Sequence, residues 1–359
     1  MRKKLLAALT AGLIALGSFC LPTQAATRDE IAAIHVVKAS DFQYWNDDSP
    51  TLQKIVDFVE DVTNPNSANY IPPEDRIATF DMDGTFYCET APLYFQEMMF
   101  FHRVLEDDSY QAPKKYVNFA KRILPKVMAH EKRTPAEEKL HVEGLTAVYA
   151  GMTPEEYRAY VRKFMDTNEV GLTNLKRGEA FYLPMVEIIS YLTNNDFAVY
   201  LDTACGVDTT RELVNGVIPI RYDRIIASDF KFTSTNMGKD DPHDHFYDRH
   251  KEKIVISGKP LYDNAKTLKI FSILNQIGKK PVLAFGNSSG DSGMLEYTLQ
   301  DNKYRSMSFF VICDDTEREL GNPKRAASDT ALALKRGWNP ISMRDEFKTI
   351  YGDNVKREK

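Results

Sequence analysis

The sequence predicts an α/β protein in which a Rossmann-like parallel sheet is interrupted, after its first strand, by an all-helical insertion. Short apolar runs alternate with helical segments in the second half of the chain, which is the pattern of a parallel sheet. From about residue 91 to 195 only helix signals occur. An insertion at this point lies over the carboxyl ends of the strands, where open α/β sheets bind ligands. The predicted strands are Ile77 to Phe80, Phe197 to Leu201, Val282 to Phe285 and Phe309 to Ile312.

Four segments follow from this pattern. Residues 1–25 are a predicted signal peptide, and residues 26–90 hold an N-terminal helix and the first core strand. Residues 91–195 form the predicted helical cap, and residues 196–359 complete the sheet domain. The whole chain has 359 residues, 43% of them hydrophobic, and this is enough for a full core. Its net charge of -5, with no basic block, argues against a nucleic-acid partner.

The amino terminus has the pattern of a secretory signal. Three basic residues precede a weakly polar to apolar run that ends before Pro22, and small residues allow cleavage after Ala25. We therefore expect export to the bacterial periplasm, with an uncleaved membrane anchor as the alternative. No later stretch is long and apolar enough to span a membrane. Cleavage would leave three cysteines, of which at most one pair can form a disulfide, Cys88 with Cys205 being conceivable.

Helix starts can be located from capping residues. Ser49 followed by Pro50 predicts an N-terminal cap, with an apolar stripe from Leu52 onward. Thr134 and Thr153 each precede Pro and are followed, at the third position, by Glu, which is the capping-box pattern. Further helices are predicted over residues 93–105, 114–129, 184–192 and 261–277.

Two carboxylates stand where the first strand ends. Asp81 and Asp83 follow Ile77 to Phe80 directly, with Gly84 after them. Such a pair can bind a hard cation, attack an electrophile or transfer a proton. The structural alternative is that Asp83-Gly84 is only a turn.

Three other stretches add groups suited to an anion and a metal. Thr203 and Ala204 end the second core strand, and a hydroxyl followed by small residues suits a cradle of backbone amides. Lys266 lies near a helix start, where it could neutralise a phosphate, although a solvated surface lysine is the plain alternative. Asn287 and Asp291 lie in a loop with two glycines after the third strand.

In this order the motifs resemble those of the haloacid dehalogenase superfamily, over about residues 76 to 320. DMDGT is similar to the first motif, which implies Asp81 as nucleophile and Asp83 as acid/base. Thr203 matches the hydroxyl of the second motif, Lys266 the lysine of the third and Asp291 the metal carboxylate of the fourth. The helical insertion resembles the C1-type cap of the phosphoserine phosphatase-like branch. Exported phosphorylcholine phosphatases are a more distant likeness.

The resemblance implies Mg²⁺-dependent hydrolysis of a small exported or extracellular phosphomonoester through an aspartyl-phosphate. Asp81, the backbone of Asp83 and Asp291 would be metal ligands. Two departures stand out. Asn287 replaces the usual aspartate of the fourth motif, so it adds a neutral oxygen, and Glu89 falls one residue short of the substrate-binding glutamate of phosphoserine phosphatases. Alternatives are a phosphotransferase or dehalogenase of the same superfamily and a non-catalytic phospho-ligand binding protein. The sequence indicates neither the natural substrate nor the oligomeric state.

Two further clusters have structural explanations. The aromatic and methionine-rich segment around Tyr94 to Phe101 could form a substrate wall, but a buried cap helix needs the same stripe. The histidines and aspartates of residues 238–250 could bind a metal, but their spacing fits no helix or strand ligand pattern and favours a solvated loop.

Overall fold

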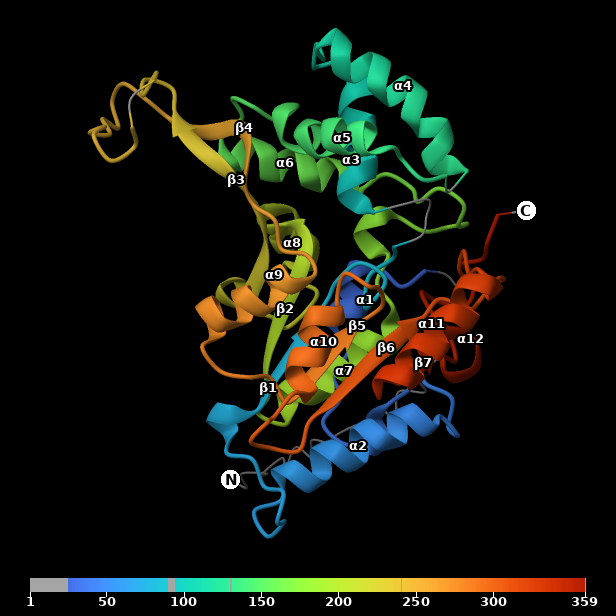
Figure 1. Ribbon diagram of the computed structural model, residues 1–359. Coiled ribbons are helices and arrows are strands. Elements are labelled where there is room, and N and C mark those ends of the chain that lie inside the picture. Colours follow the sequence, from blue (N-terminus) through green and yellow to red (C-terminus); the bar gives the residue numbers. More distant parts are fainter. Residues whose placement is uncertain (1–24, 90–93, 130, 240, 359) are drawn as a thin grey trace, which may run out of the picture.

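In the computed structural model, which describes residues 25–89, 94–129, 131–239 and 241–358, a seven-stranded sheet forms the centre of the molecule (Figure 1). The strand order is β4-β3-β2-β1-β5-β6-β7, and every neighbouring pair is parallel except β3 with β4. This confirms the predicted α/β class with a mostly parallel sheet. The strands are β1 (Ile77–Phe80), β2 (Ala198–Gly206), β3 (Ile225–Ser234), β4 (Ile254–Tyr262), β5 (Leu283–Gly286), β6 (Met307–Ile312) and β7 (Asn339–Ser342).

The helices begin at the caps that the sequence predicts. The Ser49 side chain accepts a hydrogen bond from the Leu52 amide, and both Thr134 and Thr153 form complete capping boxes. Each cap satisfies backbone donors that the first helical turn leaves unpaired. The helices are α1 (Arg28–Ala32), α2 (Pro50–Thr63), α3 (Phe95–Leu105), α4 (Lys114–Met128), α5 (Pro135–Ala147), α6 (Pro154–Met165), α7 (Leu183–Asn194), α8 (Val207–Val214), α9 (Thr267–Ser272), α10 (Ser292–Leu299), α11 (Pro323–Arg336) and α12 (Met343–Glu346).

A stack of aromatic rings holds the central strands together. Phe80 of β1, Phe285 of β5 and Phe309 of β6 are fully buried neighbours in the sheet. Their ring centroids are 4.2 Å apart for Phe80 and Phe285, and 4.8 Å apart for Phe285 and Phe309. Such pairs contribute about 0.5–1.5 kcal/mol each beyond the area they bury. The stack fixes the register of β1 against β5, and with it the relative position of the polar loops that follow both strands.

The helical cap, α3 to α6, lies above the carboxyl ends of the strands (Figure 1). Its end differs from the predicted boundary at residue 195, because α7 belongs to the sheet domain. The Trp45 indole donates to the Pro184 carbonyl at 2.9 Å, and the Ser190 hydroxyl accepts from the Val36 amide at 3.0 Å. An apolar helix has the same sequence pattern whether it covers a sheet or fills a cap, which is why the boundary was misplaced.

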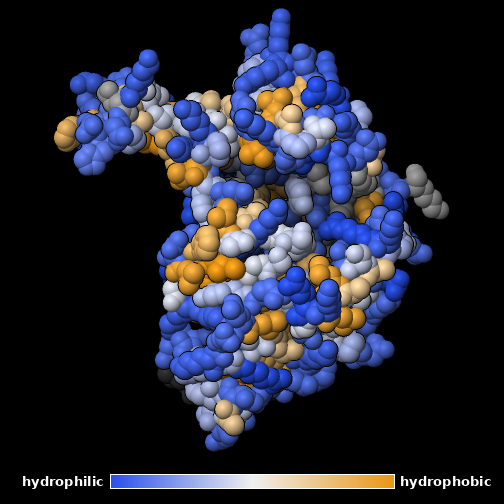
Figure 2. All heavy atoms as spheres, in the orientation of Figure 1, coloured by the Kyte–Doolittle hydropathy of each residue, from blue (hydrophilic) through white to orange (hydrophobic). Residues whose placement is uncertain are grey.

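The cap also contacts an antiparallel arm, which is formed by β3 and β4. Backbone hydrogen bonds run from Gly151 to Ile256 at 2.9 Å and from Ile256 to Met152 at 2.8 Å. Gly258 has φ +79°, and a Cβ there would lie 2.8 Å from the Ala150 Cβ, so only glycine fits this contact. Figure 2 shows the arm standing apart from the body, with a largely hydrophilic tip. That tip carries the described histidines of residues 238–250 and is mostly exposed.

The predicted helix over residues 261–277 is wrong at its start. Leu261 and Tyr262 end β4, α9 begins only at Thr267, and residues Ile273–Ile277 continue it as a π-helical turn. The reason is that β4 pairs with β3 as far as Tyr262, opposite Asp229. The strand pairing outweighs the helical pattern of this apolar segment. Strands β3, β4 and β7 were not predicted.

The predicted signal segment, apart from Ala25, lies outside the described residues. Among the described helices, none combines the length and apolar character that crossing a membrane requires. No disulfide joins Cys88, Cys205 or Cys313 in the described part of the chain.

Candidate active site

The polar residues singled out in the sequence meet at one edge of the sheet. Asp81 and Asp83 follow β1, Thr203 lies near the end of β2, and the loop that carries Asn287 and Asp291 follows β5. These three strands are neighbours, because β1 pairs with both β2 and β5. Parallel neighbours end at the same edge, so residues far apart in the sequence come together there.

A buried lysine connects the two acidic loops, and it is Lys269 rather than Lys266. The Lys269 ammonium lies 2.7 Å from Asp81 Oδ1 and 2.8 Å from Asp291 Oδ1, and it also donates to the Asp202 carbonyl. Only 1% of its side chain is exposed. Burial alone would lower the pKa of Lys269, but the carboxylates of Asp291, Asp81 and Asp202 outweigh it and raise that pKa.

Lys266 has a different place. It is the N-terminal cap of α9, with φ +58°, and its side chain is exposed. Its backbone amide donates to the Gly290 carbonyl at 2.8 Å, so it ties α9 to the loop without presenting its ammonium to the site. One helical turn separates the two lysines. The buried Ile273, four residues after Lys269, shares its helix face and is the signal that could have identified the inward lysine.

Asp291 is held by its own loop. Its Oδ2 accepts from the amides of Asn287 at 3.1 Å and Ser288 at 2.9 Å, and from the Ser288 hydroxyl at 3.1 Å. Gly286 makes room for this carboxylate, since a Cβ there would lie 2.6 Å from the Asp291 Cβ. Burial, and then the nearby Asp291 charge, raise the pKa of Asp81 to about 7 despite the opposing effect of Lys269. The site therefore concentrates more negative charge than its lysine neutralises.

Asp83 lies next to this pair with one buried oxygen unused. Its Oδ1 has no hydrogen-bond partner among the described residues. Burial, followed by repulsion from Asp81 and Glu89, raises the pKa of Asp83 well above its ordinary value. An orphaned carboxyl oxygen in a cavity is a group that can accept or deliver a proton to a bound molecule.

On the other side of Asp81, Thr203 is 1% exposed and its hydroxyl accepts from the Cys205 amide at 3.1 Å. Ala204 is exposed, and both residues line the cavity described below. Beneath them the Asp202 carboxylate accepts from the Asn264 amide at 2.7 Å. The structure therefore places the predicted hydroxyl and its small neighbour beside the carboxylates.

Glu89 and Asn287 contact one another directly. The Asn287 Nδ2 donates to Glu89 Oε2 at 2.7 Å, and Arg325 and Tyr94 each lie 3.4 Å from Glu89 Oε1. Gly84, with φ +79°, leaves the room for this contact, because a Cβ there would lie 1.9 Å from Asn287 Nδ2. Because its nitrogen donates to Glu89, the Asn287 amide could offer a bound cation or water only its oxygen. Glu89 thus acts on Asn287, which the sequence did not reveal.

The residues present fit a hard divalent cation. Asp81 and Asp291 would supply carboxylate oxygens to such an ion, and Asn287 and the Asp83 backbone carbonyl would supply neutral oxygens. The described residues contain no group of three or more acidic, histidine or cysteine side chains arranged around a metal position. Mg²⁺ takes one or two carboxylates and completes its shell with water and substrate phosphate, so a two-carboxylate set is sufficient for it.

A cavity of about 830 Å³ opens above these groups, and residues from both the sheet domain and the cap line it. Its floor holds the residues described above and Arg325 of α11. Its ceiling holds Glu97, Arg133, Glu138 and His141 of the cap. The aromatic residues from Tyr94 to Phe101 include both of the predicted roles, the buried face of a cap helix and the wall of a cavity. Phe95, Phe100 and Phe101 are buried in the cap, whereas Tyr94 is 39% exposed and lines the cavity.

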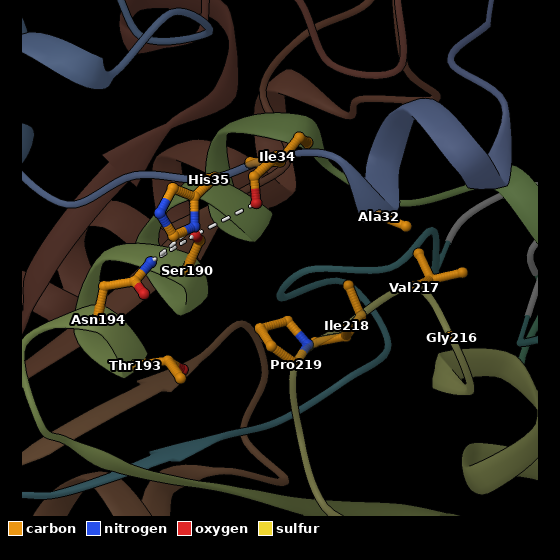
Figure 3. A pocket seen from close by; sticks show the side chains of 10 residues that line it. All are labelled: Ala32, Ile34, His35, Ser190, Thr193, Asn194, Gly216, Val217, Ile218 and Pro219. Carbon is orange, nitrogen blue, oxygen red and sulfur yellow. Dashed lines mark hydrogen bonds between the residues drawn. The ribbon is translucent and has the colours of Figure 1, made fainter.

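A second cavity, of about 320 Å³, lies between the N-terminal segment, α7 and residues 216–219 (Figure 3). Three of its polar side chains contact one another, since Asn194 Nδ2 lies 3.3 Å from both His35 Nδ1 and Ser190 Oγ. The Thr193 hydroxyl, which also lines the cavity, has no hydrogen-bond partner among the described residues. This cavity brings together none of the predicted site residues.

Exchanging each lysine separately tests the corrected position. Lys269→Met should lower kcat/KM for the hydrolysis of p-nitrophenyl phosphate by about a thousandfold or more. The buried carboxylates of Asp81 and Asp291 would lose the cation that bridges them. Lys266→Met is the matched control and should retain activity within about threefold. Steady-state rates with p-nitrophenyl phosphate, with melting temperatures to confirm folding, distinguish the two. A larger loss for Lys266→Met would restore the original expectation.

Glu89 can be tested through metal dependence. Glu89→Ala should raise the Mg²⁺ concentration that gives half-maximal rate by about tenfold or more, because Asn287 loses the partner that orients it. Glu155→Ala, at an exposed cap position, is the control and should leave the Mg²⁺ titration unchanged. If Glu89→Ala instead raises KM for substrate with the same Mg²⁺ dependence, Glu89 contacts substrate, as the sequence had suggested.

Comparison with known proteins places this geometry in context. No family model matches the chain, and no curated protein matches it in sequence. Solved structures are similar in fold. A functionally unknown protein from Anaerococcus prevotii DSM 20548 is 12% identical over 81% of this chain and 91% of its own, with a TM-score of 0.49. Cytosolic 5'-nucleotidase IIIB bound to cytidine is 11% identical over 83% and 86%, with a TM-score of 0.46. A phosphoserine phosphohydrolase-like protein from Francisella tularensis subsp. tularensis SCHU S4 is 13% identical over 72% and 99%, with a TM-score of 0.35.

These likenesses concern the fold and carry no activity to this chain. The topology can be compared with the arrangement that the sequence resemblance implies. The DMDGT motif follows the central strand β1, and the helical insertion enters directly after it. Thr203 lies near the end of β2, Lys269 lies on α9 after β4, and the loop with Asn287 and Asp291 follows β5. The chain thus has a mostly parallel α/β sheet with a helical cap inserted after the central strand β1, which is the arrangement that its resemblance to the haloacid dehalogenase superfamily implies.

Proposed function

We propose that the protein is a Mg²⁺-dependent phosphomonoester hydrolase that acts through an aspartyl-phosphate on Asp81. One observation carries the proposal. Asp81 lies beside Asp83 and is joined through Lys269 to Asp291, at the floor of a cavity that the cap covers. Carboxylate nucleophile, second carboxyl, buried cation and paired metal carboxylate are the groups that phosphoryl transfer to an aspartate needs.

In the first step the Asp81 carboxylate attacks phosphorus, and the bond from phosphorus to the leaving oxygen breaks. Asp83 gives that oxygen a proton, so the alcohol leaves neutral. In the second step the Asp83 carboxylate takes a proton from water, whose oxygen attacks the phosphorus of the aspartyl-phosphate. Asp81 is released, inorganic phosphate forms, and Asp83 carries the proton that the next cycle needs.

The other residues hold the phosphoryl group and its charge. Lys269 neutralises Asp81 and Asp291 at 2.7 and 2.8 Å. The Thr203 hydroxyl would donate to a phosphate oxygen, whereas the Cys205 and Gly206 amides already donate to Thr203 and Gln96. Asp81, Asp291, Asn287 and the Asp83 carbonyl would hold Mg²⁺, which would supply further neutralisation of the phosphate charge.

Removing the nucleophile tests the mechanism. Asp81→Asn keeps the shape of the side chain but not its nucleophilicity, so turnover of p-nitrophenyl phosphate should fall about a thousandfold or more without loss of folding. Asp47→Asn, at an exposed position, should behave like the parent protein. EDTA should abolish the parent's activity and Mg²⁺ should restore it.

Other results would point elsewhere. Near-normal hydrolysis by Asp81→Asn would rule out the aspartyl-phosphate. Activity that EDTA leaves intact would favour metal-free chemistry such as dehalogenation, and binding of phosphate without turnover would favour a binding protein.

Export to the periplasm is part of the same proposal. It rests on the basic, apolar and small-residue pattern of residues 1–25.

The mature amino terminus provides the test. Full-length protein expressed in a Gram-negative host should be recovered from the periplasmic fraction and begin at Ala26, as read by N-terminal sequencing. Protein that keeps Met1 and fractionates with the cytosol would contradict export, and protein that keeps Met1 in the membrane fraction would indicate an uncleaved anchor.

A further inference from the structure

The ceiling of the cavity carries a group of polar side chains that the proposed chemistry does not use. We call Glu97, Arg133, Glu138 and His141 the cap cluster. Glu97 comes from the first turn of α3, Glu138 and His141 come from α5, and Arg133 lies just before α5. All four line the same cavity as Asp81 and Lys269, on the opposite wall.

The cluster is partly paired within itself. The Arg133 guanidinium donates to Glu97 Oε1, and its Nε donates to Glu138 Oε2 at 2.7 Å. His141 Nε2 lies 3.2 Å from Glu97 Oε1, but not in hydrogen-bonding geometry. The side chains of Glu97 and His141 are only 2% and 5% exposed, so water does not surround them.

Three buried polar atoms are left over. Glu97 Oε2 and both ring nitrogens of His141 have no hydrogen-bond partner among the described residues. Buried polar atoms are rarely left unpaired, because each loses its hydrogen bonds to water on folding. Unpaired atoms that line a cavity are explained when a ligand completes them.

The charges and hydrogen-bonding capacity of the cluster define what would fit. Arg133 balances one of the two carboxylates, and Lys132, an exposed side chain that also lines the cavity, can balance the other. Burial, and then Arg133, lower the pKa of His141 to about 3, so its ring is neutral and has one accepting nitrogen. Burial raises the pKa of Glu97 to about 7 while Arg133 opposes this, so a bound donor would favour its ionised, accepting form. An anionic group seated against Glu97 Oε2 would be repelled by the ionised form of that carboxylate, which has no hydrogen-bond partner among the described residues.

We infer that the cap cluster is a subsite for the leaving group, which selects phosphomonoesters whose far end carries hydrogen-bond donors and no negative charge. The inference rests on the proposed function, because it assumes that the phosphate binds at Asp81 and Lys269. The donor can be a hydroxyl or a primary ammonium group, since both would satisfy Glu97 Oε2 and the accepting nitrogen of His141. Val142 and Leu145 line the same cavity and would contact the chain between the phosphate and the donor.

A matched substrate series tests the subsite. The members are alkyl phosphates of two to six carbons that end in hydroxyl, ammonium, carboxylate or methyl groups, assayed on the full chain with Mg²⁺. At the chain length that reaches the cluster, kcat/KM for the hydroxyl or ammonium ester should exceed that of the methyl ester by about tenfold or more. The carboxylate ester should be poorer than the methyl ester. If one of the two donor esters is hydrolysed faster, its end group, hydroxyl or ammonium, identifies the class of leaving group that the cap cluster selects.

Variants connect the preference to the cluster. Glu97→Gln and His141→Phe should each reduce the advantage of the donor esters to about threefold or less. The losses for the methyl esters and for p-nitrophenyl phosphate should be at least about threefold smaller than the losses for the donor esters. Glu131→Gln, at an exposed cap position, is the control and should change nothing. Equal rates for donor and methyl esters in the parent, or equal losses on every substrate in the variants, would overturn the subsite.

Binding keeps the two proposals distinguishable. The same alkyl phosphates can be titrated calorimetrically into the Asp81→Asn variant, in which turnover is not needed. Tighter binding of the donor esters than of the methyl esters would support the subsite even if the parent proved inactive as a phosphatase. Indistinguishable affinities would overturn the subsite even if the parent proved active.

Discussion

The candidate active site at the carboxyl ends of the strands depends on one buried cation, the Lys269 ammonium. The Lys269 ammonium lies within 2.8 Å of two carboxylates that come from different loops, Asp81 after β1 and Asp291 after β5. Without it, two buried negative charges would face each other, and such an arrangement is strongly destabilising. The aromatic stack of Phe80, Phe285 and Phe309 fixes the strands underneath. The hydrophobic core thus sets the positions from which the lysine can reach both acids.

The sequence predicted the residues that follow strands better than the one that lies on a helix. Asp81, Thr203 and Asp291 were located because buried strands are recognisable as short apolar runs, and residues at their carboxyl ends must share an edge. Lys269 was missed because the direction of a helical side chain depends on where the helix begins. That start depends on how far β4 pairs with β3, a long-range contact with no local signal. A shift of three residues therefore separated Lys266 from the site lysine.

The cap ceiling was invisible for a different reason. Glu97, Arg133 and His141 lie on separate segments, and each looks like part of a solvated helical face. Only the burial of Glu97 and His141 in the folded cap distinguishes this group. The predicted end of the cap included α7 because the apolar pattern of a helix indicates that the helix is buried. The pattern does not indicate which part of the protein the helix packs against. Local capping chemistry, in contrast, was predicted correctly at Ser49, Thr134 and Thr153, since each cap depends on residues three positions apart.

The first turn of α3 joins the two walls of the cavity. Tyr94, at its start, contacts Glu89 on the floor at 3.4 Å, and Gln96 accepts from the Gly206 amide at the end of β2 at 2.7 Å. Glu97 is the next residue and belongs to the ceiling. A ligand that binds Glu97 therefore contacts the first turn of α3, and Tyr94 at the start of this turn contacts Glu89. Glu89 accepts a hydrogen bond from Asn287 and so orients it. The leaving-group end of a substrate and the metal end of the site are connected through four side chains, so recognition by the cap has a physical route to the chemistry below it.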